Sequence, residues 1–193
     1  MKFSLPCVIF AGGKSSRMGE DKALLPFGGY ETLTEYQYRR LLPHFQKLYI
    51  STKCDKFSFE APLIFDDETL GTYAPTAGLL AVFHHLDDEA FFALSVDTPF
   101  VDEAVIEKMV SSFNAGEMEA VIAKSPNGIH PMCGIYTRKL LPKLMQMVQE
   151  GQHRLGYLLK SSATHFVPFD RDDPFLNLNH PEEYQLAIKK IQA

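Results

Sequence analysis

Basic and small residues are interleaved in the segment 10–22, FAGGKSSRMGEDK, which follows an apolar run near the N-terminus. Glycines let a backbone approach a phosphate closely, and successive N–H groups of such a loop form a nest for anions. Lys14, Arg17 and Lys22 add positive charge. The segment predicts a phosphate-binding loop, with Lys22 swinging back to neutralise phosphate charge. A flexible loop with solvated lysines is the alternative interpretation.

Two better-known phosphate motifs do not fit this segment. Gly13-Lys14-Ser15 resembles the end of a Walker A motif, but that motif requires a glycine where Val8 stands. The dinucleotide fingerprint G-x-G-x-x-G is absent as well. The pattern therefore indicates a phosphate site of another kind.

A candidate metal-binding carboxylate, Asp97, follows the apolar segment 91–95. Ligands collect at the carboxyl ends of parallel strands, so we expect Asp97 to lie at the same sheet edge as the glycine-rich loop. A carboxylate there can hold Mg²⁺, which bridges phosphate oxygens and takes few protein ligands. The alternative is that Asp97 caps a helix that begins near Pro99.

Other polar residues follow predicted strands or precede the last helix. Asp66 and Asp67 come after a short strand, where a carboxylate can accept hydrogen bonds from a base or ribose; a solvated turn is the alternative. Asn177 can reach the metal or the phosphates if the chain returns to the same edge. Asn179 is explained as the cap of the last helix, with Glu182 as its capping partner.

Composition excludes several classes of protein. The 193 residues fit one domain, and the net charge of −5 gives no electrostatic footprint for nucleic acid. No apolar run approaches the roughly 20 residues needed to cross a membrane, and no signal peptide is recognisable. Three widely spaced cysteines and seven scattered histidines predict neither a disulfide framework nor a zinc site. We expect a cytoplasmic protein that binds neither nucleic acid nor membranes.

Segments with strand and helix patterns alternate along the chain, which predicts an α/β sandwich with a mostly parallel sheet. Strands are expected at 5–11, 47–51, 63–65, 91–95, 120–123, 132–136 and 164–168. Helices are expected at 32–42, 77–85, 101–113 and 140–150, with a short one from 154 and a last one from 179.

Several motifs together resemble one family, the molybdenum cofactor guanylyltransferases, or MobA family. The loop matches its signature in the pattern FAGGxSxRMGxDKALL from Phe10 to Leu25. Asp97-Thr98-Pro99 is similar to its metal-site motif, 177–183 to its C-terminal asparagine motif, and 151–154 to its glycine-to-arginine turn. The matches stay in order over nearly the whole chain.

This resemblance implies a Rossmann-like, three-layer α/β/α nucleotidyltransferase fold with a mostly parallel central sheet. Residues 1–193 would form one domain, whose N-terminal half binds nucleotide and whose C-terminal half binds the acceptor. The implied reaction transfers GMP from GTP to the terminal phosphate of molybdenum-carrying molybdopterin and releases pyrophosphate, with Mg²⁺ as cofactor. The expected partners are GTP, molybdopterin and, transiently, proteins of molybdenum cofactor synthesis or delivery. We expect a monomer.

Site residues follow from the resemblance and from the residue pattern. The resemblance assigns GTP contacts to Phe10, Ala11, Gly12, Lys22, Asp67 and Asp97, and the Mg²⁺ contact to Asp97. The residue pattern adds four sets: Gly13 for GTP, Asn177 for the metal, Arg17 beside Lys22 and Asp97 for catalysis, and Arg154 and Lys14 for the acceptor phosphate.

The chain departs from the family pattern at four places, of which the first is Phe10, where leucine is common and the contact is through the backbone. Ser51 stands where an asparagine is common, and Ser95-Val96 stands where proline-cysteine is common. The segment 74–78, APTAG, replaces a glycine-proline-leucine-alanine-glycine segment beside the base, which leaves open which nucleotide base is bound. The alternatives are a cytidylyltransferase, a sugar-phosphate nucleotidyltransferase or a non-catalytic nucleotide-binding protein. The presence of both Asp97 and Lys22 argues against the last.

Overall fold

A seven-stranded sheet forms the centre of the protein in the computed structural model, which describes residues 2–13, 19–66, 75–114 and 116–192. Its strand order is β3-β2-β1-β4-β6-β5-β7. The strands are β1 (Cys7–Phe10), β2 (Leu48–Thr52), β3 (Leu63–Phe65), β4 (Ala90–Ser95), β5 (Ala120–Ser125), β6 (Gly128–Thr137) and β7 (Thr164–Pro168).

Most of the strand pairs are parallel, as the alternating pattern predicts. The pairs β1–β2, β1–β4, β2–β3 and β5–β7 are parallel, whereas β6 runs antiparallel to both β4 and β5. The reversed strand follows from the short turn Pro126-Asn127, because a turn of this length can join only antiparallel neighbours. The strand β6 begins at Gly128, four residues before the expected start at Met132.

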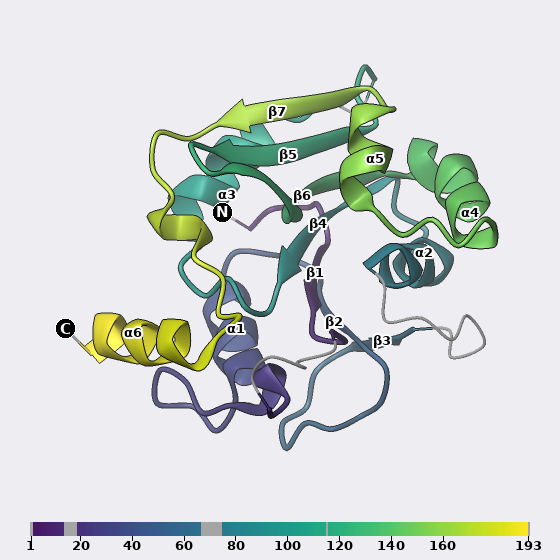
Figure 1. The fold of residues 1–193 in the computed structure, drawn as a ribbon. Helices are drawn as coiled ribbons and strands as arrows, with labels where there is room; N and C mark the ends of the chain where they lie inside the picture. The colour runs from purple at the N-terminus through teal and green to yellow at the C-terminus, as the bar shows by residue number, and fades with distance from the viewer. Residues whose placement is uncertain (1, 14–18, 67–74, 115, 193) are drawn as a thin grey trace.

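Helices cover both faces of the sheet (Figure 1). They are α1 (Leu33–Leu41), α2 (Pro75–His85), α3 (Glu103–Ser111), α4 (Leu141–Gln149), α5 (Leu155–Lys160) and α6 (Pro181–Gln192). Strand side chains alternate between faces, so Val8 joins one core cluster with α2, α4 and α5, while Cys7 and Ile9 join the other with α1, α3 and α6. The three-layer α/β/α architecture is confirmed.

Local capping signals place several helix ends. Thr32 accepts a hydrogen bond from the N–H of Glu35 at 3.0 Å, as its capping-box spacing predicts. Asp102 caps α3 by accepting from the N–H of Val105 at 2.9 Å. The alternative role of Asp97 as the cap of this helix is therefore wrong. The left-handed backbone of Gly151, with φ of 66°, follows the end of α4 as predicted.

The start of the last helix needs a correction. The helix α6 begins at Pro181 rather than Asn179, because proline fits the first helical turn, where its missing N–H costs nothing. The carboxylate of Glu183 accepts from the N–H groups of Asn179 at 2.7 Å and His180 at 2.9 Å. Glu183, and not Glu182, is thus the capping partner.

Candidate active site

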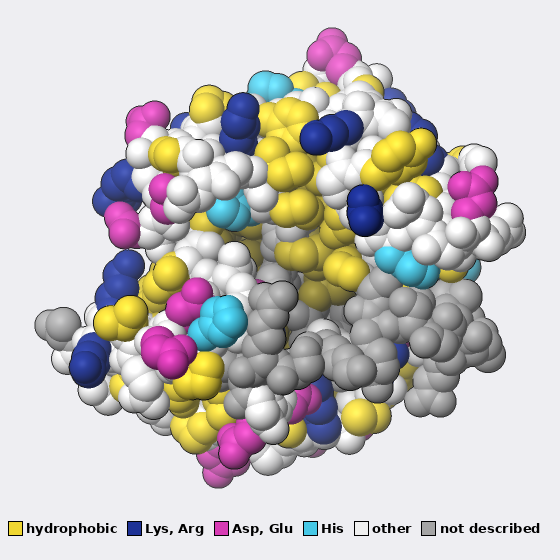
Figure 2. All heavy atoms as spheres, viewed as in Figure 1, with side chains coloured by type: hydrophobic (Ala, Val, Ile, Leu, Met, Phe, Trp, Pro, Cys, Tyr) yellow, Lys and Arg dark blue, Asp and Glu magenta, His cyan; other side chains and the backbone are white. Residues whose placement is uncertain are grey.

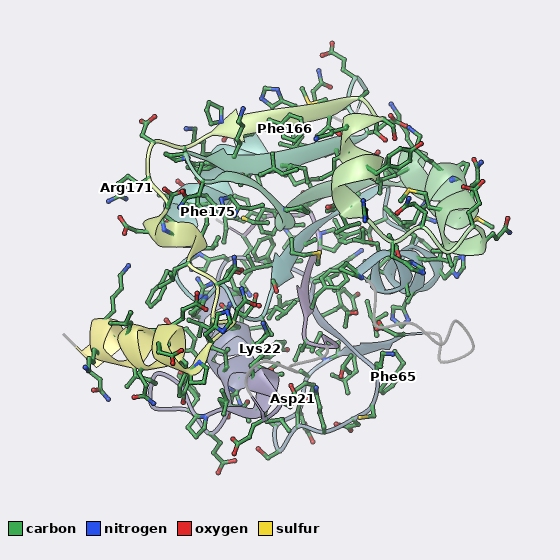
Figure 3. The ribbon with its side chains drawn as sticks, viewed as in Figure 1. Asp21, Lys22, Phe65, Phe166, Arg171 and Phe175 are labelled. Atoms are coloured by element: carbon green, nitrogen blue, oxygen red, sulfur yellow. The ribbon has the colours of Figure 1, made fainter. Side chains whose placement is uncertain are left out.

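Lys22 and Asp97 meet at the carboxyl edge of the sheet. The strands β1 and β4 are paired with Phe10 opposite Ser95, so the loop after β1 and the turn after β4 start side by side. The Nζ atom of Lys22, labelled in Figure 3, forms a hydrogen-bonded ion pair with the Oδ2 atom of Asp97. The hydroxyl of Ser95 donates to the Oδ1 atom of the same carboxylate at 2.5 Å. The predicted meeting of loop and acidic turn is confirmed.

The segment before α6 returns to the same edge. The N–H of Leu178 donates to the carbonyl of Asp97 at 2.9 Å, and Lys22 donates to the Oδ1 atom of Asn179 at 3.1 Å. The interpretation of Asn179 as a helix cap is therefore wrong, since its side chain contacts Lys22 and Glu183 makes the capping bonds. Three segments that are far apart in the sequence thus form one site.

Two side chains on α1, the buried Gln37 and the half-buried Arg40, hold the Asp97 turn from behind. Gln37, which is fully buried, donates from Nε2 to the carbonyl of Val96 at 3.1 Å. Arg40 donates from Nε and Nη2 to the Oε1 atom of Gln37 at 2.8 and 2.6 Å, and from Nη1 to the carbonyl of Val101 at 2.6 Å. Burial lowers the pKa of Arg40. The two side chains therefore clamp both ends of the segment that carries Asp97.

Lys56 holds the other side of the site. Its Nζ atom donates to the carbonyl of Ala11 at 3.1 Å and to the Oδ2 atom of Asp21 at 2.5 Å. Asp21 in turn caps the 3₁₀ turn η1 (Lys22–Leu24) by accepting from the N–H of Ala23 at 3.0 Å. These contacts fix the direction from which Lys22 enters the site.

One large cavity and two smaller pockets meet around these residues. The cavity measures about 420 Å³ and is the hollow in the middle of the face in Figure 2. Its lining includes Asp97, Asn177 and the β6 residues 129–133. One small pocket, of about 130 Å³, is lined by the loop residues with Lys22 and Asp97. The other measures about 100 Å³ and shares Ser95 with both neighbours.

Asp66 lines the smallest of these three pockets, the one of about 100 Å³. The hydroxyl of Ser51 donates to its Oδ1 atom at 3.1 Å, and burial raises the pKa of the Asp66 carboxyl. A Cβ atom on Gly12 would lie 3.2 Å from the Asp66 carboxylate, and one on Gly78 would lie 3.1 Å from the ring of Phe10. Glycines at these two positions therefore keep the pocket open beside a carboxylate.

The remaining candidate residues are distributed unevenly. Phe10, Ala11, Gly12 and Gly13 line one or both of the small pockets, and Asn177 lines the large cavity. Arg154 is exposed and follows His153, a cavity residue, but does not itself line the described cavity. Lys14, Arg17 and Asp67 lie outside the described residues. Their roles stay predictions.

Two histidines that the sequence left unassigned line the large cavity. His130 bonds through Nε2 to the hydroxyl of Ser125 at 2.7 Å, and His153 bonds through Nδ1 to the hydroxyl of Thr76 at 2.7 Å. Thr76 belongs to the segment that departs from the family pattern, so that departure reaches the large cavity through His153. A threonine at a fully buried position of the apolar helix α2 was the one local signal for this contact.

The family model for the MobA-like NTP transferase domain matches residues 7–165 of this chain. The chain belongs to this family of MobA-like NTP transferases. A molybdenum cofactor guanylyltransferase of Campylobacter jejuni subsp. doylei is 38% identical over 181 residues, which cover 94% of each chain. Another, of Helicobacter pylori strain G27, is 34% identical and covers 98% of this chain and 94% of its own.

Solved structures agree with a MobA-like NTP transferase fold. Molybdopterin-guanine dinucleotide biosynthesis protein A of Archaeoglobus fulgidus has a TM-score of 0.82 at 20% identity, covering 97% of this chain and 99% of its own. A cytidylyltransferase of Leptospira borgpetersenii has a TM-score of 0.71 at 18% identity, covering 96% and 86%. No helix among the described residues is long and apolar enough to cross a membrane.

Proposed function

We propose that this MobA-like transferase moves GMP from GTP to the terminal phosphate of molybdenum-carrying molybdopterin, forming molybdopterin guanine dinucleotide and pyrophosphate. The observation that carries the proposal is the meeting of Lys22, Asp97 and Asn179 on the border between the loop pocket and the large cavity. Relatives that are 34–38% identical over nearly their whole length, and named as guanylyltransferases, support the same reaction.

The two kinds of cavity suit two substrates. The small pockets, built from the N-terminal half apart from Met132 of β6, take the nucleotide. The large cavity, which β6 and α5 help to line, takes the acceptor. An oxygen of the acceptor phosphate attacks the α-phosphorus of GTP, and the bond from that phosphorus to the bridging oxygen of the β-phosphate breaks. Such a displacement needs positioning and charge neutralisation rather than an enzyme nucleophile.

Each residue of the site has a role in this displacement. Loop N–H groups at Gly12 and Gly13 hold the β- and γ-phosphates, as glycine-rich nests do. The N–H of Ala11 is bonded to the carbonyl of Ser51 at 2.8 Å, so Ala11 contributes to the wall of the loop pocket instead. The ammonium group of Lys22 stabilises the charge that develops on the leaving pyrophosphate, and Arg17 assists it. Asn179 accepts from Lys22 and so orients the ammonium group, and both Asn177 and Asn179 line the cavity that takes the acceptor.

The described residues fit a magnesium ion held by one carboxylate. Among them, no group of three or more His, Cys, Asp or Glu forms a metal cage, but Mg²⁺ in nucleotide sites takes one or two carboxylates plus phosphates and water. Asp97 would hold the ion, with Asn177 beside it, because a carboxylate that accepts from Ser95 and Lys22 still has lone pairs to offer. When bound, the ion would supply charge neutralisation on the triphosphate.

The smallest pocket supports guanine as the base. Guanine presents an imino and an amino N–H side by side, and a carboxylate accepts both at once. Asp66, fixed by Ser51, is a carboxylate of this kind at the wall of the pocket. Cytosine offers only its amino group there. We therefore assign base recognition to Asp66, while the resemblance assigns a GTP contact to the next residue in the sequence, Asp67.

The wider setting follows from the substrates. We place the reaction in the cytoplasm, where GTP is present, and infer a monomer that receives molybdopterin from proteins of cofactor synthesis and passes its product to delivery proteins.

Pyrophosphate release tests the proposal directly. The four nucleoside triphosphates are each incubated with the protein and Mg²⁺, with and without molybdenum-loaded molybdopterin. We expect release only with GTP and molybdopterin together. Release with CTP at the same rate, or with a sugar phosphate as the acceptor, would replace the proposal by one of the related transferases. Release without any acceptor would indicate a hydrolase.

A further inference from the structure

A chain of hydrogen bonds connects Asp172 to His130 at the wall of the large cavity. Ser125, at the end of β5, donates from its hydroxyl to the Oδ1 atom of Asp172 at 2.5 Å. The same hydroxyl lies 2.7 Å from the Nε2 atom of His130, at the start of β6. None of the three residues Asp172, Ser125 and His130 has been assigned above to GTP, to the metal or to the acceptor.

The direction of the chain fixes where the proton of His130 lies. Asp172 also accepts from the N–H of Asn127 at 3.0 Å, and its bonds with Ser125 and Asn127 lower the pKa of its carboxyl. An ionised carboxylate can only accept, so the single hydroxyl proton of Ser125 points to Asp172. The Ser125 oxygen must then accept from His130, which places a proton on Nε2.

The other ring nitrogen, Nδ1, is left with a lone pair that is open to solvent. One face of the imidazole stacks on Phe175, with ring centroids 4.3 Å apart and planes 13° apart; Phe175 is labelled in Figure 3. Among the described residues no side-chain nitrogen or oxygen is buried without a partner. Since the described bond of His130 is at Nε2, solvent reaches Nδ1, and His130 lines the large cavity.

We propose that the Nδ1 atom of His130 accepts a hydrogen bond from an N–H group of a planar nitrogen heterocycle, the pterin of the acceptor, and that Ser125 and Asp172 hold His130 in the tautomer that permits it. This inference rests on the proposed function, which places the acceptor in the large cavity. His130 is then a binding residue that determines acceptor specificity, and Ser125 and Asp172 are positioning residues.

The surroundings of His130 agree with this role. Ile129, Pro131, Met132 and Leu155 give the cavity an apolar wall against which a flat ring can pack. Burial lowers the pKa of His130, and the charge of Asp172 opposes this to a smaller extent. The neutral imidazole, with Nδ1 as an acceptor, is therefore favoured at neutral pH.

Two substitutions at His130 distinguish the contributions of its two ring nitrogens to acceptor binding. The amide of asparagine stands as many bonds from the backbone as Nδ1, whereas the amide of glutamine reaches the place of Nε2. We expect His130→Asn to keep the KM for molybdopterin near the wild-type value and His130→Gln to raise it roughly three- to tenfold, the loss of one neutral hydrogen bond. The KM for GTP stays unchanged in both. His165→Gln, at an exposed position of β7, is the matched control.

Nitrogen-15 NMR provides a readout that does not depend on turnover. We expect the wild-type His130 to show the Nε2–H tautomer, Ser125→Ala to show a mixture, and 6-hydroxymethylpterin to shift the Nδ1 signal of the wild type. An Nδ1–H tautomer in the wild type, or equal KM values for molybdopterin in the two His130 variants, would overturn the proposal. If GTP binds but no pyrophosphate is released, the proposed function fails, and the pterin titration alone decides the role of His130.

Discussion

The ammonium group of Lys22 donates a hydrogen bond to the carboxylate of Asp97, a residue 75 positions further along the chain. Neither residue lies in a strand or an α-helix, yet both are held in place by neighbouring side chains. Asp21 and Lys56 fix the turn that carries Lys22. Gln37 fixes the turn that carries Asp97. A cation and a carboxylate fixed at the mouth of two cavities are suited to handle a negatively charged substrate that enters from either side.

Removing the cation should affect turnover more than folding. We expect Lys22→Met to lower kcat for pyrophosphate release by about 10²–10³-fold, as the loss of one preorganised charge in a transition state does. Lys47→Met, which removes a lysine paired with Asp88 on the surface, is the control and should leave kcat unchanged. Equal activities of the two variants would show that Lys22 is not catalytic.

Neutralising the carboxylate should change the dependence on magnesium. Asp97→Asn keeps the size of the side chain but offers one neutral oxygen, so we expect a Mg²⁺ requirement raised at least about tenfold and a strongly reduced kcat, because hard cations prefer carboxylates. Asp102→Asn is the matched control, since asparagine caps a helix as well as aspartate does. Wild-type Mg²⁺ titration curves for Asp97→Asn would refute the assignment.

The contacts of Gln37 and Arg40 on α1 predict a coupled loss of stability and turnover when Arg40 is replaced. We expect Arg40→Met to destabilise the fold by about 1–3 kcal/mol, because Gln37 loses its partner in the core. We expect turnover to fall as well, because Asp97 is shifted, while the KM for GTP changes little. Urea unfolding and steady-state kinetics measure both effects.

Arg39 on the same helix supplies the comparison for that experiment. It is 44% exposed and pairs with Glu35, so Arg39→Met should change stability by less than about 0.5 kcal/mol. Arg40→Lys should rescue only part of the loss, because an ammonium group cannot reproduce the forked contacts of a guanidinium. A full rescue by lysine would mean that charge alone matters at this position.

The carboxylate of Asp66 should lower the stability of the folded protein at neutral pH and strengthen nucleotide binding. Burial raises its pKa, so the folded state holds more protons than the unfolded chain between the ordinary and the raised value, and stability falls as pH increases through that window. We therefore expect Asp66→Asn to raise the Tm at neutral pH while it weakens GTP binding. Thermal shifts with and without GTP test both parts, and unchanged GTP affinity would remove Asp66 from base recognition.

Local signals in the sequence predicted the scaffold and the edge where the site lies. The capping box at Thr32, the strand pattern before Asp97 and the glycine after α4 each involve neighbours within a few residues, and each was confirmed. The meeting of Asp97 with the loop followed from a general rule for parallel sheets. Fold and site edge could thus be inferred without any knowledge of distant contacts.

Contacts between distant residues could not be predicted in this way. Gln37 reads as one more polar residue of an amphipathic helix, and nothing near it indicates that it binds a carbonyl 59 residues away. The error at Asn179 has the same origin, because its position beside a helix start suggested a cap while its true partner, Lys22, lies on the opposite end of the chain. The role of His130 could be inferred only from the structure, which places Ser125 and Asp172 in one hydrogen-bonded series with it.

The bond from Lys22 to Asn179 spans 157 residues, and this has a consequence for synthesis. On the ribosome the glycine-rich loop and the Asp97 turn emerge well before the segment that returns to them, and N-terminal parts of a chain begin to fold while the rest is still being made. A nascent or prematurely terminated chain that ends before Asn177 can pair β1 with β4 and still lack both asparagines. The candidate active site is therefore completed late in translation, after residues 177–179 have emerged.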